Sequence, residues 1–237
     1  MCHQNFKNLC AASINFTEVL SQIKTLIFDF DGTIADSISV GLEIANSLAD
    51  EFKYKKVERS QLPLYKNMSS REIIKEIGIS YFRLPFLIRR LRKAMKERVK
   101  EVLLFDGIAE ELKILQEKGF IMGIVTSNSK ENVVQFLTNN GCEQYFRFIN
   151  SDVKLFHKSG AIKTLLKKQG INKNQVMLLG DESRDIEAAH KCGVRIIAVS
   201  WGFHTRDHLR ACKPDFLIDH PSEISGLLDS INSQVRS

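Results

Sequence analysis

Short apolar runs recur along the chain, and helical patterns separate most of them. The runs have the length of strands, contain many β-branched residues and are largely apolar on both faces, as the strands of a buried parallel sheet are. They lie at Thr25–Phe30, Ile121–Thr126, Phe146–Asn150, Val176–Leu179, Arg195–Ser200 and Phe216–Ile218. Helical spacing of apolar residues is found at Ile108–Lys118, Lys130–Asn140, Ser159–Gln169, Ser183–Lys191 and Arg206–Cys212. This alternation predicts an α/β fold, a three-layer, doubly wound parallel sheet with helices on both faces.

The interval between Asp36 and Phe105 breaks the alternation. It contains no central strand, and its apolar residues recur at helical spacing. The expected helices are Ile38–Phe52, Ser70–Ile77 and Leu84–Leu103. We therefore expect a helical cap inserted at residues 38–104, a core formed by residues 23–37 and 105–237, and an N-terminal extension at residues 1–22 with a helical pattern at Phe16–Ile23.

Two aspartates close the first predicted strand. Asp29 and Asp31 are two residues apart, and Gly32 then allows the chain to turn sharply. Such carboxylates repel each other unless a cation neutralises them, and the carboxyl ends of strands in an open α/β sheet are where ligands bind. Mg²⁺ takes carboxylates of this kind together with substrate phosphate and water. The alternative is an ordinary aspartate–glycine turn without a ligand.

A second acidic pair follows another predicted strand. Asp181 ends that strand, and Asp185 lies one helical turn further on. The alternative is a helix N-cap with an acid that favours the helix dipole, and Glu182 fits that alternative better than a ligand role. Two acidic strand ends in one sheet nevertheless fit a shared metal site better than two coincidences.

Two further segments are candidates for holding phosphate. Thr126, Ser127 and Asn128 lie at the end of a predicted strand, where hydroxyl and backbone N–H groups can hold phosphate oxygens, although such residues are also ordinary loop material. Lys158 precedes a predicted helix, where a lysine opposes the helix dipole. A nearby anion would explain that position, and a solvated surface lysine is the alternative.

Taken together and in this order, the four segments resemble the motifs of the haloacid dehalogenase-like phosphatase superfamily. They read DFDGT at 29–33, IVT at 124–126, Lys158 and GDESRD at 180–185. The stretches around the first motif, at Leu104–Ile108 and at Val199–Phe203 are similar to the phosphoglycolate-phosphatase-like branch, which carries a helical cap of the C1 type after its first motif. The resemblance implies the Rossmann-like core of that superfamily.

The resemblance also implies catalytic roles. Asp29 would be the nucleophile that takes the phosphoryl group as an aspartyl-phosphate, and Asp31 would be the general acid for the leaving group and then the base for water. Thr126 would bind phosphoryl oxygens, and Lys158 would neutralise them and orient Asp29. Phosphoryl transfer needs such positioning and charge neutralisation above all.

Metal and substrate contacts are implied in the same way. Mg²⁺ would be bound by Asp29, Asp181 and the backbone carbonyl of Asp31, with Asp185 as a direct ligand or as a support for one. The further residues implied or considered for phosphate or substrate contact are Gly32, Thr33, Ser127, Asn128 and, at the start of a cap helix, Arg71, for which a role in ordinary helix structure is the alternative.

The resemblance implies a Mg²⁺-dependent phosphatase that hydrolyses a small phosphomonoester, phosphoglycolate-like or a sugar phosphate, through an aspartyl-phosphate. Asp31 argues against a dehalogenase, because the resemblance implies that dehalogenases lack an acid at that place. The alternatives are a hexose-phosphate mutase of the same superfamily and a non-catalytic member that binds a polyanion.

The net charge of +6 first suggests a nucleic-acid partner. Residues 38–104, however, contain 15 lysines and arginines against 8 acidic residues, whereas the rest of the chain contains 19 against 20. The excess therefore belongs to the predicted cap, without stacking aromatics or a groove-reading motif, and no nucleic acid is expected. The expected partner is a small phosphorylated metabolite, with no membrane, in a monomer or homodimer.

Cysteines and histidines add little chemistry. The five cysteines are scattered and form no CxxC pair, which fits reduced thiols and a cytoplasmic location. His204 and His208 are four residues apart, a spacing that could place a metal on one helix face. No third ligand is evident, and we expect both histidines to lie at the solvated start of a helix.

Overall fold

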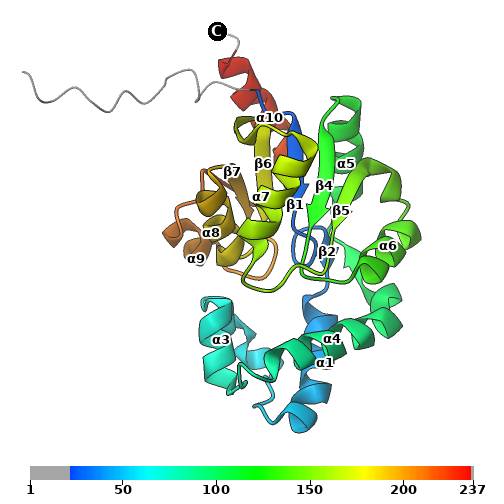
Figure 1. The fold of residues 1–237 in the computed structure, drawn as a ribbon, viewed down its shortest axis with the longest axis vertical. Helices are drawn as coiled ribbons and strands as arrows, with labels where there is room; N and C mark the ends of the chain where they lie inside the picture. Colours follow the sequence, from blue (N-terminus) through cyan, green and yellow to red (C-terminus); the bar gives the residue numbers. More distant parts are fainter. Residues whose placement is uncertain (1–21, 236–237) are drawn as a thin grey trace, which may run out of the picture.

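The computed structural model describes residues 22–235, and its centre is a six-stranded parallel sheet (Figure 1). The strands are β1 (Thr25–Phe28), β4 (Ile121–Val125), β5 (Phe146–Asn150), β6 (Val176–Gly180), β7 (Arg195–Val199) and β8 (Phe216–Ile218). Their order is β5-β4-β1-β6-β7-β8, so β1 lies in the interior between β4 and β6. The predicted α/β fold with a parallel sheet is confirmed.

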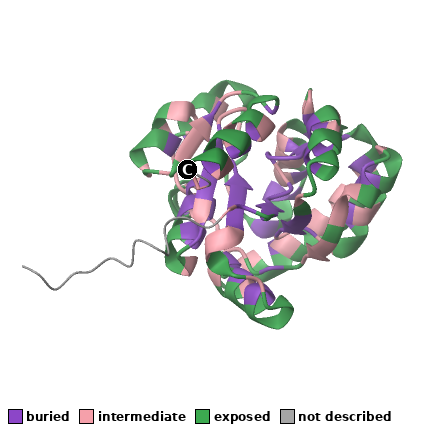
Figure 2. Cartoon of the chain, turned by 90° about the horizontal axis from the view of Figure 1, so that it is seen from above, coloured by how far each residue is buried: buried purple, intermediate pink, exposed green. Residues whose placement is uncertain are grey.

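Helices cover both faces of the sheet, and the alternation of side chains along β1 shows why. Leu26 and Phe28 point to one face, while Ile27 points to the other. The first face is covered by α5 (Ile108–Glu117), α6 (Lys130–Asn139) and α10 (Glu223–Gln234). The second is covered by α7 (Lys158–Gln169), α8 (Ser183–Cys192) and α9 (Arg206–Ala211). Figure 2 shows the resulting layers, with buried strands between helices whose outer sides are exposed.

The segment between β1 and β4 is helical and forms a separate body below the sheet in Figure 1. It contains α1 (Ile38–Phe52), α2 (Leu62–Tyr65), α3 (Ser70–Ile77) and α4 (Leu84–Arg98). We call these helices and their connections the cap. Short 3₁₀ helices lie at Arg59–Gln61 and Val99–Glu101 in the cap and at Glu143–Tyr145 and Lys173–Gln175 in the core.

The two connections between core and cap pair with each other. β2 (Ala35–Asp36) and β3 (Leu103–Leu104) form a small antiparallel ladder in which Ala35 faces Leu104. The helix predicted to continue to Leu103 therefore ends earlier, because residues 103 and 104 are drawn into this ladder. Val102, between the helix and the strand, already has an extended backbone.

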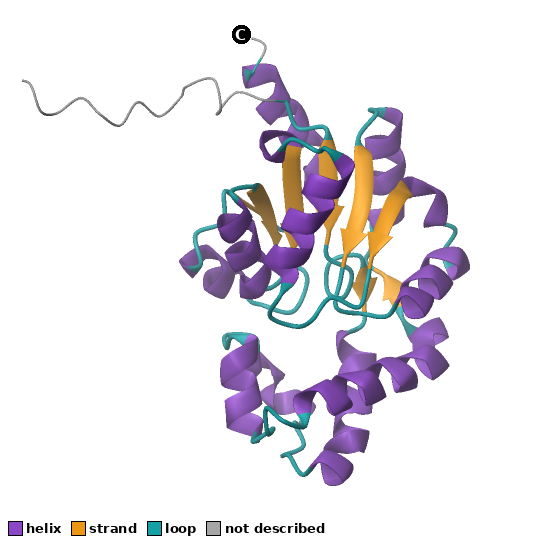
Figure 3. Cartoon of the chain, in the orientation of Figure 1, coloured by secondary structure: helices purple, strands orange, loops and turns teal. Residues whose placement is uncertain are grey.

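The strands of the sheet all point toward the cap, as their arrowheads in Figure 3 show. The loops that follow β1, β4 and β6 consequently meet at one edge of the sheet, facing the cap. This is the edge at which open α/β sheets bind ligands.

The predicted extension at residues 1–22, with its helical pattern at Phe16–Ile23, falls almost entirely outside the described residues. Among the helices at residues 22–235, none combines the length and apolar character that crossing a bilayer would demand.

Candidate active site

Asp29 lies at the centre of the site, directly after β1. Its side chain is 3% exposed, and its Oδ1 accepts a 2.8 Å hydrogen bond from the backbone N–H of Phe30. Its Oδ2 accepts no hydrogen bond from the described residues, although Lys158 Nζ lies 3.0 Å away. Burial raises the pKa of Asp29, and the Lys158 ammonium opposes that rise. The sheet therefore presents one buried carboxylate oxygen that is close to a cation and held by no donor.

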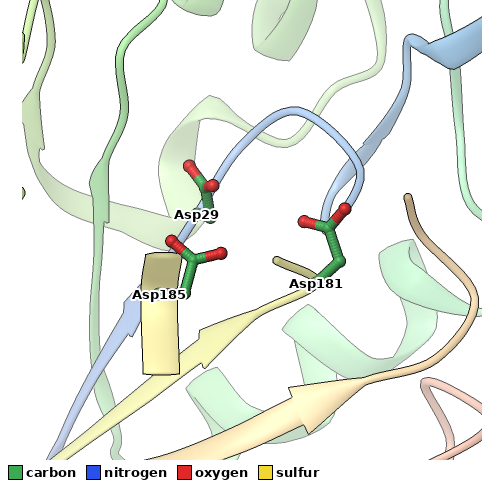
Figure 4. A group of neighbouring side chains, drawn as sticks. All are labelled: Asp29, Asp181 and Asp185. Atoms are coloured by element: carbon green, nitrogen blue, oxygen red, sulfur yellow. The ribbon is translucent and has the colours of Figure 1, made fainter. Parts of the chain in front are cut away.

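Asp29, Asp181 and Asp185 form a buried acidic cluster (Figure 4). One oxygen from each carboxylate lies within 4.8 Å of the others. Burial raises the pKa of Asp181 well above its usual range, and the neighbouring carboxylates raise it further. Three buried carboxylates at this spacing need a compensating cation, and an all-oxygen set suits a hard divalent ion such as Mg²⁺.

Asp181 is held in place by hydrogen bonds from two loops, those that follow β1 and β7. Thr33 Oγ1 donates a 2.8 Å hydrogen bond to Asp181 Oδ1, and the backbone N–H of Phe203 donates one of 2.8 Å to Oδ2. A Cβ added to Gly32, whose φ is +79°, would lie 2.0 Å from Asp181 Oδ2, and one added to Gly202 would lie 2.3 Å from Asp181 Cβ. Glycine at both positions thus lets two backbones approach this carboxylate closely.

Lys158 is a buried lysine in the first turn of α7. Its Nζ donates a 2.6 Å hydrogen bond to Asp185 Oδ1 as well as lying beside Asp29. Burial disfavours the ammonium, but Asp185 and Asp29 outweigh that effect and raise the pKa of Lys158. At 9% exposure this side chain does not fit the alternative of a solvated surface lysine.

Asp31 accepts hydrogen bonds from the residue before α1 and from the loop after β4. Ser37 Oγ donates a 2.8 Å hydrogen bond to its Oδ1, and Asn128 Nδ2 lies 3.1 Å from its Oδ2. Burial nevertheless raises the pKa of Asp31 to about 6. A carboxyl group with this pKa exchanges a proton near neutral pH, as a general acid or base must. That its backbone carbonyl binds a metal stays a prediction.

The loop after β4 brings Thr126, Ser127 and Asn128 to the same edge. Thr126 is buried, and its hydroxyl accepts a 3.0 Å hydrogen bond from the backbone N–H of Asn128. Because that hydroxyl oxygen is the acceptor, its own hydrogen remains available for a phosphate oxygen. The amide of Asn128 meets Asp31, so this residue orients the carboxyl group.

Arg71 is the predicted contact that the structure does not bring to the acidic cluster. Its guanidinium lies over the ring of Phe156, 5.1 Å from the ring centroid, and the residue is exposed. It does not line the cavity that contains Asp31 and Asp181. Its role in substrate binding stays a prediction without structural support.

The site also contains Arg184, for which the sequence reasoning assigned no role. Its guanidinium lies 2.6 Å from Glu182 Oε1 and 3.9 Å from Asp29 Oδ2. Although burial disfavours its charge, the surrounding carboxylates raise its pKa, so the group stays cationic. Its position in the first turn of α8, between Asp181 and Asp185, is the sequence signal that could have indicated it.

His204 connects the core to the cap, and the expected solvated helix start is wrong for this residue. It is 1% exposed, its Nδ1 accepts a 2.9 Å hydrogen bond from the backbone N–H of Ser183, and its Nε2 lies 2.9 Å from the carbonyl oxygen of Met68. Glu182, expected only to cap its helix, does cap it and also accepts a 3.1 Å hydrogen bond from Ser70. These contacts hold the start of α3 over the site.

Comparison with known proteins places this arrangement in context. The model of the family described as haloacid dehalogenase-like hydrolase matches residues 26–199. A phosphoglycolate phosphatase from Synechococcus elongatus is 33% identical over 202 residues, covering 85% of this chain and 95% of that protein. The pyrophosphatase PpaX from Listeria welshimeri is 23% identical, covering 87% and 97%. A crystal structure of a predicted phosphatase from Clostridium acetobutylicum matches with a TM-score of 0.75 at 22% identity, covering 89% and 99%.

Proposed function

The chain belongs to the haloacid dehalogenase-like hydrolase family and is a phosphatase of the phosphoglycolate-phosphatase-like kind, and from that premise we propose its reaction. It hydrolyses a small phosphomonoester in a Mg²⁺-dependent way, through an aspartyl-phosphate on Asp29. The observation that carries this proposal is Asp29 Oδ2, a buried carboxylate oxygen with no donor of its own, 3.0 Å from the Lys158 ammonium. An oxygen in that state is available to attack phosphorus.

The first half-reaction transfers the phosphoryl group to the protein. Asp29 Oδ2 forms a bond to phosphorus while the bond from phosphorus to the ester oxygen breaks. Asp31, whose pKa burial raises to about 6 so that a protonated fraction persists near neutral pH, gives its proton to the departing ester oxygen, which leaves as an alcohol. The Ser37 and Asn128 hydrogen bonds keep the Asp31 carboxyl group at a fixed place during this step.

The second half-reaction releases phosphate. Asp31, now ionised, takes a proton from water as the water oxygen bonds to phosphorus, and the bond from phosphorus to Asp29 breaks. Asp29 is regenerated as a carboxylate, Asp31 is protonated again, and inorganic phosphate leaves. One carboxyl group thus serves as acid and then as base, as a raised pKa allows.

Charge neutralisation falls to the surrounding residues. Lys158 and Arg184 supply positive charge beside Asp29, and the hydroxyl of Thr126 donates to a phosphoryl oxygen. Mg²⁺ would be held by Asp29, Asp181, Asp185 and the carbonyl of Asp31, and would supply further charge neutralisation at the phosphoryl oxygens. The raised pKa of Asp181 supports this assignment, because the cluster carries more acid than its lysine balances.

The alternative of a polyanion-binding protein finds less support in the cap. Several of its basic side chains already pair with acidic ones: Arg98 with Glu43 and Glu101, and Arg90 with Glu51. A small phosphorylated metabolite is therefore the proposed partner, without nucleic acid or membrane. The cytoplasmic location and the monomeric or homodimeric state stay predictions from the sequence.

The proposal is tested by phosphate release from a panel of phosphomonoesters, with Mg²⁺ and with a chelator. We expect release only with the metal, and Asp29→Asn should lower kcat at least ~10³-fold because it removes the nucleophile. Asp207→Asn, on the exposed side of α9, is the matched control and should retain activity. Full activity in Asp29→Asn would contradict the proposal. Transfer of phosphate between positions of a hexose, without release, would favour the mutase alternative instead.

A further inference from the structure

A single cavity of about 460 Å³ joins the acidic cluster to the interior of the cap. At its core end it is lined by Asp31, Asp181 and Asn128, the residues that surround the proposed reaction centre. From there it continues between α1, α3 and α4 of the cap. Its volume is in the range of small-molecule sites, roughly 300–1,000 Å³. A phosphate bound at Asp29 would place the rest of the molecule in this space.

The cap end of the cavity is apolar. Its walls are aliphatic side chains from all three long cap helices, with Leu155 and Phe203 of the core beside them. They include Leu42, Ile73, Ile77, Leu87, Leu91 and Met95.

Polar side chains that line the cap side of this cavity are already bonded to the protein. The hydroxyl of Ser37 donates to Asp31, that of Ser70 to Glu182, and that of Tyr54 to the carbonyl oxygen of Ala45. Because each of these hydroxyl groups already donates its hydrogen bond to another residue, the walls at the cap side offer a substrate few free hydrogen-bond donors.

Arg92 is the cationic side chain among the described residues that line the cavity. Its guanidinium lies 2.8 Å from Asp152 Oδ1 and also donates to the carbonyl oxygen of Ser127. An acidic partner thus offsets part of its charge, while its Nε, also buried, has no hydrogen-bond partner among the described residues. Arg92 contacts core residues, so a carboxylate that reaches past it to the apolar cap end of the cavity would have no cation of its own, which is unfavourable.

We propose that the substrate is the phosphomonoester of an apolar alcohol, with an alkyl or aryl group that occupies the cap cavity. The inference rests on the proposed phosphatase function and narrows its substrate class. Burying an apolar group in these walls favours binding, whereas a polar group at the cap end of the cavity would lose water without gaining partners. The cap would then favour such esters over those with a polar far end.

A matched pair of esters tests this directly. n-Hexyl phosphate and 6-phosphonooxyhexanoate have the same chain and differ in the carboxylate at its far end. We expect kcat/KM for hexyl phosphate to be at least ~100-fold higher, because a carboxylate at the far end of a six-carbon chain would lie among the apolar walls of the cavity. From ethyl to hexyl phosphate, kcat/KM should rise roughly threefold for each methylene that enters the cavity.

Two substitutions on α4 locate the effect in the cavity. Ile88 lines it and is half-buried, while Phe86, two residues earlier, is 65% exposed and does not line it. Ile88→Lys should lower kcat/KM for hexyl phosphate about tenfold or more and narrow the preference between the two esters, because it adds a cation to the apolar wall. Phe86→Lys should change neither value by more than about twofold. Thermal unfolding of both variants shows whether each is folded.

Binding to Asp29→Asn separates this inference from the function on which it rests. Dissociation constants for both esters are measured by calorimetry in the presence of Mg²⁺. Tighter binding of hexyl phosphate, with no hydrolysis of either ester by the unaltered protein, would support the apolar site and overturn the phosphatase assignment. Equal binding, or a preference for the carboxylate ester, would overturn the apolar substrate even if phosphate is released.

Discussion

Lys158 donates a 2.6 Å hydrogen bond to Asp185 in the buried centre of the site. The same ammonium lies 3.0 Å from Asp29, so one cation is shared between the proposed nucleophile and a carboxylate on the next helix. Asp185 in turn accepts a 3.1 Å hydrogen bond from the backbone N–H of Glu182 at the start of α8. The charge beside Asp29 is therefore fixed by two helix starts, those of α7 and α8.

Lys158→Met should impair both catalysis and folding stability. Removing the cation leaves Asp29 and Asp185 buried without their partner, so the free energy of unfolding should fall by about 3 kcal/mol at neutral pH without metal. The loss of charge at the phosphoryl group should lower kcat/KM by at least ~10²-fold. Urea denaturation and steady-state kinetics measure the two effects.

Lys163→Met provides the control, since Lys163 is an exposed lysine on the same helix. Its stability should remain within about 0.5 kcal/mol of the unaltered protein. A Lys158→Met protein with normal kinetics would show that the ammonium has no part in the reaction.

Mg²⁺ should stabilise the folded protein, because the acidic cluster exists only in that state. At 100 times its dissociation constant a ligand adds about 2.7 kcal/mol to the free energy of unfolding, which corresponds to roughly 5–10 °C in Tm for a chain of this size. Asp181→Asn should abolish this shift by removing one carboxylate of the cluster. Differential scanning calorimetry with and without the ion measures it.

Asp207→Asn is again the control and should keep the full shift, because this aspartate lies outside the cluster. If Mg²⁺ raised the Tm of Asp181→Asn as much as that of the unaltered protein, the metal would be bound by other residues.

Asp29, Asp181 and Lys158 could be recognised from the sequence for a physical reason. Parallel strands end at a common edge, so residues that follow β1 and β6 meet regardless of the chain length between them. Lys158 follows from the same principle, because α7 begins on that side of the sheet. The α/β fold was predictable because buried strands and helices differ in their apolar spacing.

Contacts between cap and core could not be predicted in the same way. His204 meets the carbonyl of Met68, a backbone group with no sequence signal, and its burial depends on how the cap is placed. The β2–β3 ladder has two residues in each strand, too few for a detectable pattern. The apolar cavity likewise depends on the spacing of the cap helices, which amphipathic periodicity alone does not determine.

Gly202→Ala should disturb the site through packing alone. A Cβ at this position would lie 2.3 Å from both Asp181 Cβ and the carbonyl oxygen of Gly32, so the backbone must move. We expect the free energy of unfolding to fall by about 1–3 kcal/mol and the Mg²⁺ shift in Tm to shrink, because Asp181 is displaced. Chemical denaturation and calorimetry measure these effects.

Gly226→Ala is the contrasting substitution, in the exposed part of α10, where an added Cβ meets nothing within 4 Å. Alanine favours the helix there and should stabilise the protein by up to ~1 kcal/mol. If Gly202→Ala behaved like Gly226→Ala, the loop after β7 would be more adaptable than its packing against Asp181 indicates.

Asp31 makes the pH dependence of the reaction specific to the leaving group. Its pKa is raised to about 6, chiefly by burial, so the protonated form prevails below that pH and is lost above it. kcat/KM covers the steps up to phosphoryl transfer to Asp29, in which Asp31 acts as the acid. For an alkyl phosphate, whose leaving oxygen needs that proton, kcat/KM should fall about tenfold per pH unit well above pH ~6. For p-nitrophenyl phosphate, whose leaving group departs without a proton, the fall in kcat/KM should be much shallower.

Both esters lose their own second proton near pH ~6, so a change in substrate charge alone would affect the two profiles alike. Asp31→Asn should remove the difference between the profiles, and identical profiles in the unaltered protein would show that Asp31 is not the acid.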